Sequence, residues 1–192
     1  MKYDELHRVY SLPLFELLKR SREVHEANWP QNEVQLCTLL SIKTGGCSED
    51  CSYCSQSEKD AVMERARAAR ATGSTRFCMG AAWKGVRTGT KRFDQVKDII
   101  ESVSELCMEV CVTLGELGAD EAVQLKEAGV TAYNHNVDTS REHYPNIVTT
   151  HTYDDRLNTI RHAQNAGMSI CCGGILGLGE TPEDRLKMIE TL

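Results

Sequence analysis

Short apolar runs alternate with amphipathic stretches over most of the chain, and this alternation narrows the possible folds more than any other feature. The stretches between the runs carry apolar residues at spacings of three and four, as surface helices do, and several of them stop at glycine. The five strand-like runs are "VQLCTLLSIKT", "RFCMGAA", "EVCVTLG", "AYNHNVDT" and "SICCGGILGLG". Repeated strand–helix units predict a parallel sheet, either doubly wound or closed into a barrel.

The number of units limits how much of a barrel the sequence can form. A complete (β/α)₈ barrel has eight units and typically about 250 residues, whereas five units are present in these 192 residues. A barrel would therefore lack about three units. Because the first thirty residues have a helical pattern, we predict an N-terminal helical segment (1–30) followed by a partial barrel domain (31–192). Near the other end, Thr181-Pro182-x-Asp184 predicts the start of a last helix.

The charge pattern excludes several kinds of partner. The 22 basic and 28 acidic side chains give a net charge of −6 and are interleaved along the chain, so we expect no nucleic-acid or membrane surface. No stretch approaches the roughly 18 apolar residues of a membrane span. The first twenty residues lack both a continuous apolar core and a small-residue cleavage site. We therefore expect no secretory signal and a cytoplasmic location.

Nine cysteines in such a chain call for an explanation. An odd count in a chain of this length fits a disulfide scaffold poorly and favours metal binding or redox chemistry. Cys47, Cys51 and Cys54 lie on a loop after the first predicted strand, where parallel α/β folds build their sites. Three thiolates can hold three corners of a [4Fe–4S] cluster and leave the fourth iron open. The alternative is a structural zinc site with a distant fourth ligand.

Three further cysteines lie one per strand, in the second, third and fifth predicted strands: Cys78, Cys111 and Cys171. Side chains alternate across a strand, so Cys111 and Cys171 point away from the faces of their apolar neighbours. If those neighbours pack against outer helices, the two thiols face the barrel interior. Three converging cysteines could hold a second cluster, or they could be buried as small hydrophobic residues.

The fourth predicted strand is unusually polar for a buried parallel strand. Alternation places Asn134, Asn136 and Asp138 on one face of "YNHNVDT". Buried polar groups are costly without partners, so this row indicates either a structural hydrogen-bond network or a ligand site. Arg156 follows in the first turn of the next predicted helix, where it could bind an anion together with free backbone N–H groups. The alternative is a solvated surface arginine.

The sequence resembles the biotin synthase family of the radical S-adenosylmethionine (SAM) superfamily from about residue 33 to the end. The resemblance is carried by "VQLCTLLSIKTGGCSEDCSYCSQS", "GSTRFCMGAAWK", "YNHNVDTS", "TYDDRLNTI" and "CCGGILGLGET". It implies an α/β fold, namely the TIM-type (β/α) barrel of the radical SAM class, here incomplete. It also implies the last step of biotin biosynthesis, which is SAM-dependent insertion of sulfur into dethiobiotin.

The resemblance assigns the cysteines to two clusters. It implies that Cys47, Cys51 and Cys54 hold a [4Fe–4S] cluster whose open iron is chelated by SAM. The ligands that it implies for a [2Fe–2S] cluster, the presumed sulfur source, are Cys78, Cys111 and Cys171. The fourth ligand in the family is an arginine from a later strand, which this sequence does not reach. The remaining cysteines are interpreted as packing or incidental thiols: Cys37, Cys107 and Cys172. Cys107 also stands where glycine would suit a helix end.

The other implied contacts involve SAM and the substrate. The residues expected to contact SAM are Tyr53, Asn136, Asp138 and Arg156. Asn134 and Asn136 are expected to lie toward dethiobiotin, and no catalytic residue is expected beyond the cluster ligands. The resemblance further implies an electron donor such as flavodoxin or ferredoxin, and a homodimer when the protein is full length.

The sequence also departs from the family pattern. Only 23 residues separate Cys54 from Cys78, fewer than the family usually has, and the later strands are missing. We therefore expect a chain that is truncated at the C-terminus and carries a short internal deletion. Three alternatives to a working enzyme of this family stay open: an inactive fragment of it, a different radical SAM enzyme, and a zinc-binding or redox module.

Overall fold

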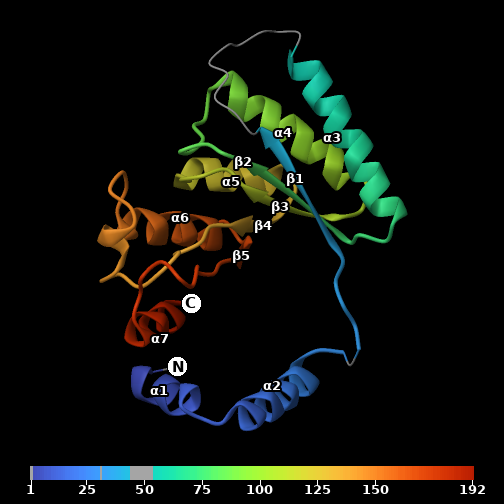
Figure 1. Cartoon of the computed structure of the whole chain (residues 1–192). Coiled ribbons are helices and arrows are strands. Elements are labelled where there is room, and N and C mark those ends of the chain that lie inside the picture. The colour runs from blue at the N-terminus through green and yellow to red at the C-terminus, as the bar shows by residue number, and fades with distance from the viewer. Residues whose placement is uncertain (1, 31, 44–53) are drawn as a thin grey trace. The chain divides into compact units, whose positions relative to one another are not determined.

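The structure, a computed structural model, describes residues 2–30, 32–43 and 54–192 (Figure 1). The chain divides into two compact units. We call Gln35–Asn136 with Asp154–Cys172 the sheet unit, and Met1–Val34 with Val137–Tyr153 and Gly173–Leu192 the terminal unit. None of the described helices is long and apolar enough to cross a membrane.

The sheet unit contains five parallel strands in the order in which they occur in the sequence. They are β1 (Cys37–Lys43), β2 (Arg76–Ala81), β3 (Glu109–Thr113), β4 (Val130–Asn134) and β5 (Ser169–Cys171). Each strand pairs in parallel with the strand before it. This arrangement confirms the five strand–helix units and the partial (β/α) barrel that the sequence predicts.

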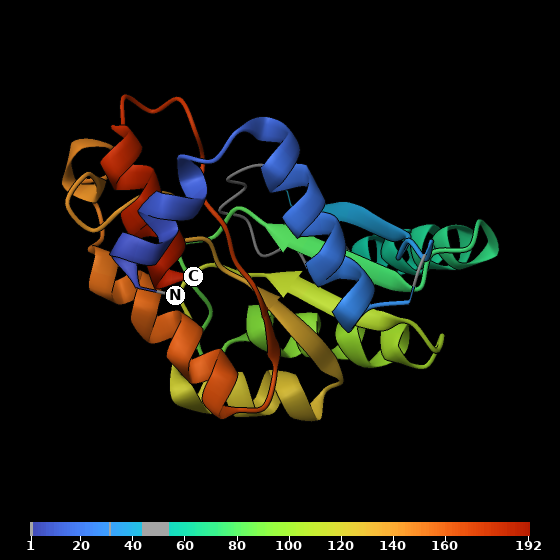
Figure 2. The same cartoon turned by 90° about the horizontal axis from the view of Figure 1, so that it is seen from below.

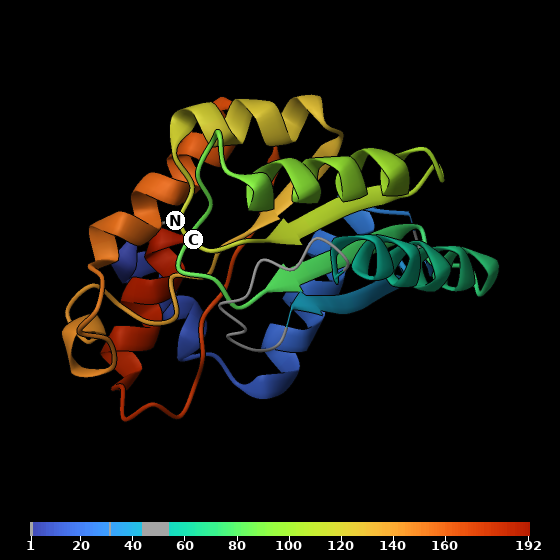
Figure 3. The same ribbon diagram turned by 90° about the horizontal axis from the view of Figure 1, so that it is seen from above.

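Helices connect successive strands and cover one face of the sheet (Figures 2 and 3). They are α3 (Cys54–Ala71), α4 (Lys91–Ser104), α5 (Ala119–Glu127) and α6 (Tyr153–Asn165). Alternate strand residues, such as Phe77 and Val110, are fully buried in the same core as Phe93 and Ile100 of α4. Side chains alternate across a strand, so the intervening residues, which include the cysteines, belong to the opposite face of the sheet.

The fourth and fifth strands are shorter than the sequence predicts. The predicted strands extend to residues 139 and 179, whereas β4 ends at Asn134 and β5 ends at Cys171. Backbone pairing continues past these ends in single bonds, as when the Val137 N–H donates to the Gly173 carbonyl at 3.1 Å. The left-handed backbone of Asp138, with φ of 66°, then breaks the extended conformation.

The terminal unit is helical. It contains α1 (Tyr3–Tyr10), α2 (Leu14–Asn28), a 3₁₀ turn (Tyr144–Asn146) and α7 (Pro182–Thr191). The Tyr3 N–H donates to Glu190 Oε1 at 3.0 Å, which ties α1 to α7. Thr181 and Asp184 form a reciprocal capping box, because the Asp184 N–H donates to Thr181 Oγ1 and the Thr181 N–H donates to Asp184 Oδ2. The predicted start of the last helix is therefore confirmed.

The capping carboxylate should make the terminal unit sensitive to acid. Hydrogen bonds from the Ser140 hydroxyl and from Thr181 lower the pKa of Asp184 from 3.8 to about 2. Its stabilising contribution is complete above its unfolded-state pKa and is lost as the pH falls toward the folded-state value. We expect Asp184→Asn to weaken α7 at neutral pH and to flatten its pH dependence between these two values. Amide hydrogen exchange of α7 measures both effects, and an unchanged pH profile would contradict this assignment.

Candidate cluster site

Three cysteines from separate strands belong to the face of the sheet opposite the helices. Cys78 of β2 is directly in register with Cys111 of β3, and each of the two thiols affects the pKa of the other. Cys171 of β5 is close enough for its charge to act on both of them. The sequence predicts that these cysteines share one face of the sheet, and the structure places all three on that face. Their convergence on one cluster stays a prediction.

The environment of these thiols favours a bound cation. The pKa of Cys111 is raised to about 12, first by burial and then by the negative charges of neighbouring Cys78 and Cys171. Burial likewise raises the pKa of Cys78. Charge on one of these thiols raises the pKa of its neighbours, whereas a bound metal centre would hold thiols in their deprotonated form.

Cysteine thiolates are the usual ligands of an iron–sulfur cluster. Within the part of the chain that the structure describes, no three His, Cys, Asp or Glu side chains are arranged to hold a metal ion. The assignment of Cys78, Cys111 and Cys171 as cluster ligands therefore stays a prediction.

Asn134 provides a polar contact to this group. It is in register with Cys171, and its Nδ2 atom donates to the Cys171 Sγ atom across 3.5 Å. Such a bond orients the sulfur and withdraws electron density from it. Hydrogen bonds to ligand sulfurs are one way in which a protein sets the reduction potential of a cluster. Asn134 therefore lies beside the candidate cluster site as well as in the predicted polar row.

Arg76 is a neighbour of the site that sequence reasoning missed. It forms an ion pair with Glu109, with 2.7 Å between Nη2 and Oε2, and its charge acts on both Cys78 and Cys111. Cys37 is in register with Arg76, and its charge also reaches Cys78. The spacing in the sequence could have identified this neighbour, because Arg76 lies two residues before Cys78 and so belongs to the same face of the strand.

The polar row of the fourth strand has the predicted alternation. Asn134 and Asn136 are half-buried, whereas Tyr133 and His135 between them are buried. The Tyr133 hydroxyl donates to the Gly115 carbonyl at 2.8 Å, on the helix-covered side. Asp138 belongs to the terminal unit, where it is half-buried and forms an isolated parallel bridge with Gly174.

The structure locates some of the other predicted site residues. Arg156 lies half-buried in the first turn of α6, as the sequence predicts. Cys54 is the first residue of α3, but its side chain lies outside the described residues. Cys47, Cys51 and Tyr53 also lie outside them. The ligand roles of all these residues therefore stay predictions.

Cys107 and Cys172 lie apart from the cysteine group. Cys107 follows the end of α4 with a left-handed φ of 55°, which explains why glycine would suit that position. Its side chain is exposed. Cys172 follows Cys171 directly, just past the end of β5, and is half-buried.

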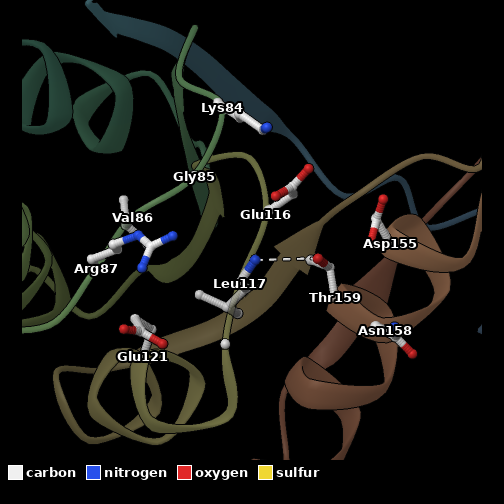
Figure 4. A pocket seen from close by; sticks show the side chains of 11 residues that line it. Lys84, Gly85, Val86, Arg87, Glu116, Leu117, Glu121, Asp155, Asn158 and Thr159 are labelled. Atoms are coloured by element: carbon white, nitrogen blue, oxygen red, sulfur yellow. Dashed lines mark hydrogen bonds between the residues drawn. The ribbon is translucent and has the colours of Figure 1, made fainter. Parts of the chain in front are cut away.

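A polar pocket of about 510 Å³ opens among the loops that follow β2 and β3 and the start of α6 (Figure 4). At its edge the Leu117 N–H donates to Thr159 Oγ1 at 3.2 Å. Its lining residues are Lys84, Gly85, Val86, Arg87, Glu116, Leu117, Gly118, Glu121, Asp155, Asn158 and Thr159. None of the predicted site residues lines this pocket.

The thiol environments predict an order of chemical reactivity. In the cluster-free protein, the exposed thiols should react with iodoacetamide before the buried one; among the described residues the exposed thiols are Cys37, Cys107 and Cys171. Cys111 should react at least about tenfold more slowly, since burial and its raised pKa leave little thiolate. Mass spectrometry of time points measures these rates, and denaturant should equalise them. Equal rates for Cys111 and Cys107 in the folded protein would contradict the described packing.

Comparison with known families identifies the chain. The sequence model of the radical SAM superfamily matches residues 41–192. The chain belongs to the radical SAM superfamily. Membership in this superfamily implies SAM and a [4Fe–4S] cluster, in agreement with the interpretation of the three-cysteine loop.

Relatives of this radical SAM chain are biotin synthases. It is 50% identical to the mitochondrial biotin synthase of Emericella nidulans over 202 aligned positions, covering 98% of this chain and 51% of the relative. Identity to the mitochondrial enzyme of Arabidopsis thaliana is 51%, with 98% and 53% covered. For the Myxococcus xanthus enzyme the identity is 49%, with 98% and 58% covered. The chain thus spans little more than half the length of these relatives. The alignments are longer than this chain, so the relatives contain residues without a counterpart in it.

Solved structures agree on the fold. The crystal structure of methylornithine synthase (PylB) matches with a TM-score of 0.76 at 15% identity, covering 99% of this radical SAM chain and 60% of that one. HydG, a maturase of the [FeFe]-hydrogenase, matches with a TM-score of 0.73 at 17% identity, covering 98% and 46%. At these identities the likeness establishes the fold and nothing about the substrate.

Proposed function

We propose that the chain carries the cluster-binding and SAM-binding part of a biotin synthase, which inserts sulfur into dethiobiotin to form biotin. The observation that carries this proposal is the set of three thiols, one each from β2, β3 and β5, on the face of the sheet opposite helices α3–α6. A second cluster in that position would distinguish a sulfur-inserting enzyme from other radical SAM enzymes. The identity of about 50% to several biotin synthases supports the same proposal.

The chain's own residues would hold two iron–sulfur groups and SAM. In this proposal Cys47, Cys51 and Cys54 bind the [4Fe–4S] cluster. When bound, this cluster and SAM together supply the one-electron chemistry that removes hydrogen from an unactivated carbon. The second group, a [2Fe–2S] cluster, would be held by Cys78, Cys111 and Cys171 and would supply the sulfur.

The polar side chains would orient the reactants. Arg156 at the start of α6 would bind the SAM carboxylate, assisted by free backbone N–H groups of the first helical turn. Asn136 and Asp138 would bind SAM, with Asp138 at the ribose hydroxyls and Tyr53 packing near the adenine. Asn134 would donate its amide hydrogen to Cys171, as in the present structure, and offer its carbonyl oxygen toward dethiobiotin.

Anaerobic reconstitution with iron and sulfide tests the proposal. We expect a brown protein whose Mössbauer spectrum contains a [4Fe–4S] cluster and which cleaves SAM reductively when an electron is supplied. A colourless protein that takes up only zinc would contradict the proposal. Radical SAM activity that does not depend on Cys78, Cys111 and Cys171 would instead indicate a different enzyme of the superfamily.

An inactive piece of the same enzyme is a second candidate, and the partial coverage of the relatives favours it. We expect the purified chain to bind the first cluster and to form no biotin, because the family's arginine ligand to the second cluster is not in the sequence. Biotin formed by this chain alone, measured by mass spectrometry, would contradict that expectation.

Location and partners belong to the same proposal. The sequence leads us to expect a cytoplasmic protein, whereas two of the relatives are named as mitochondrial enzymes. Fractionation of the source cells decides between these compartments. A flavodoxin or ferredoxin would supply electrons, and a second copy of the full-length protein would form the homodimer.

A further inference from the structure

The polar pocket among the loops after β2 and β3 has no role in the proposed function (Figure 4). Its volume of about 510 Å³ lies within the range of roughly 300–1,000 Å³ that is usual for small-molecule sites. All of its lining residues belong to the sheet unit. The pocket is therefore a candidate site for a second ligand.

The pocket is lined by charges of both signs that do not neutralise one another. Lys84 and Arg87 come from the loop after β2, and Glu116 comes from the loop after β3. Within the described ranges of the chain, none of these three side chains forms an ion pair or a side-chain hydrogen bond. Their charges can therefore pair with a ligand instead.

The backbone that carries Lys84 and Glu116 is fixed. The Glu116 N–H donates to the Lys84 carbonyl at 2.7 Å, and Gly85 forms an isolated parallel bridge with Glu116. A Cβ atom added to Gly85 would lie only 2.7 Å from the Glu116 carbonyl oxygen, so this close approach requires glycine. The two opposite charges are thus presented from adjacent, hydrogen-bonded backbone segments.

The other walls of the pocket are also held in place. The Leu117 N–H donates to Thr159 Oγ1 at 3.2 Å, and the Leu117 carbonyl oxygen lies 2.7 Å from His162 Nδ1. The Thr88 N–H donates to Glu121 Oε1 at 2.9 Å. Because these bonds join the two loops, α5 and α6, binding of a ligand requires little conformational ordering.

The pocket also offers an apolar surface and a hydroxyl group. Val86 and Leu117 line it and are buried, so they provide contact for an aliphatic group. Thr159 is buried as well, and its oxygen accepts the Leu117 N–H. Among the residues that the structure describes, no acceptor takes the hydrogen of this hydroxyl, which can therefore donate to a ligand.

The charge balance of the lining restricts the class of ligand. Two cations and three carboxylates give a formal charge of 2 − 3 = −1, the carboxylates being Glu116, Glu121 and Asp155. The carboxylates would repel a polyanion such as a nucleotide, and the two cations would repel a polycation. A small molecule with one charge of each sign is complementary to both kinds of group.

We propose that this pocket binds a small zwitterion, an α-amino acid with an aliphatic side chain. The carboxylate of the ligand pairs with Lys84 and Arg87, and its ammonium group pairs with Glu116. Its side chain packs against Val86 and Leu117. This site goes beyond the proposed function and depends on neither cluster, so the chain as purified can be used to test it.

The first experiment measures binding of L-leucine to the chain by isothermal titration calorimetry. We expect a Kd of about 1 mM or lower, which is typical of a small ligand with a few polar contacts. Isoamylamine lacks the carboxylate of leucine, and isocaproate lacks its ammonium group. Each analogue should bind at least about fivefold more weakly than leucine, because it loses one of the two charge pairs. Absence of leucine binding would overturn the proposal, as would equal binding of leucine and both analogues.

The second experiment assigns the ammonium group of the ligand to Glu116. Glu116→Gln keeps the size of the side chain and the backbone hydrogen bond but removes the charge. We expect it to weaken leucine binding about fivefold and to leave isocaproate binding unchanged, since isocaproate has no ammonium group. The matched control is Glu64→Gln, which makes the same change at an exposed position of α3 outside the pocket. Equal leucine affinities of the two variants would overturn the proposal.

Nuclear magnetic resonance locates the ligand independently of these variants. Leucine should shift the amide resonances of Thr88 and Leu117, whose N–H groups belong to the bonds around the pocket. Shifts confined to other parts of the chain would place the ligand elsewhere and overturn the proposal. None of these results depends on whether the chain takes up iron and sulfide, so the proposed function stands or falls separately.

Discussion

Replacing Cys54 by serine is expected to abolish the first cluster and the chemistry that depends on it. Cys54 is one of three predicted ligands, and a serine hydroxyl at neutral pH is a far poorer iron ligand than a thiolate. Iron and sulfide bound after anaerobic reconstitution should fall to background for this centre. Reductive cleavage of SAM should fall to the rate without protein, a loss of roughly 10⁶-fold or more, because enzymes accelerate reactions at least on that scale.

Cys107→Ser is the matched control for this experiment. Cys107 has an exposed side chain and lies in the turn between α4 and β3, outside the sheet strands themselves. The same thiol-to-hydroxyl change there should leave both the Mössbauer spectrum and SAM cleavage intact. Full cluster content in Cys54→Ser, or equal losses in both variants, would rule out the assignment of the three-cysteine loop.

Gly115→Ala is expected to cause the largest loss of stability among single substitutions of glycine on the sheet unit's loops. Gly115 has φ of +84°, which strains any other residue, and an added Cβ would overlap the carbonyl oxygens of Trp83 and Lys84. Its own carbonyl accepts the Tyr133 hydroxyl, so the backbone cannot shift without breaking that bond. Strain and overlap together should lower the free energy of unfolding by about 2–5 kcal/mol, measured by urea denaturation.

Gly89→Ala separates the contribution of backbone strain to the loss of stability from the contribution of steric overlap. Gly89 also has a left-handed backbone, with φ of +73°, but no atom lies within 4 Å of an added Cβ. The loss there should be only about 1 kcal/mol, from backbone strain alone. If the two variants were equally stable, the close approach of the loops after β2 and β3 would have no energetic role.

Hydrophobic periodicity predicted the order and type of the main elements. It predicted five strands and the helices between them, because a sheet covered by helices on one face imposes a regular burial pattern on each element. It placed the ends of the fourth and fifth strands too late. The local alternation of apolar and polar residues indicates which face of the strand a residue occupies. The end of a strand depends instead on its partner strand and on backbone dihedrals such as the left-handed φ of Asp138.

Strand alternation predicted which face of the sheet the candidate site residues occupy, but not the contacts that they make with neighbouring strands. One cysteine per strand was enough to expect that Cys78, Cys111 and Cys171 share one face of the sheet. The bond from Asn134 to Cys171 and the register of Cys78 with Cys111 depend on how neighbouring strands are aligned. That alignment is set by contacts distant in sequence, so the sequence of one strand does not contain it.

The order of the strands in the sheet has a consequence for how the protein folds during its synthesis. Every strand pairs with the one made just before it, so each strand–helix unit finds its partner already present as the ribosome adds the next. Loop-closure entropy is kept moderate at each addition, because one connection of a helix and its flanking loops separates successive strands. The early strand–helix units can therefore fold before the later units are synthesised. Pulse proteolysis of nascent chains of increasing length would show protection from cleavage appearing one unit at a time.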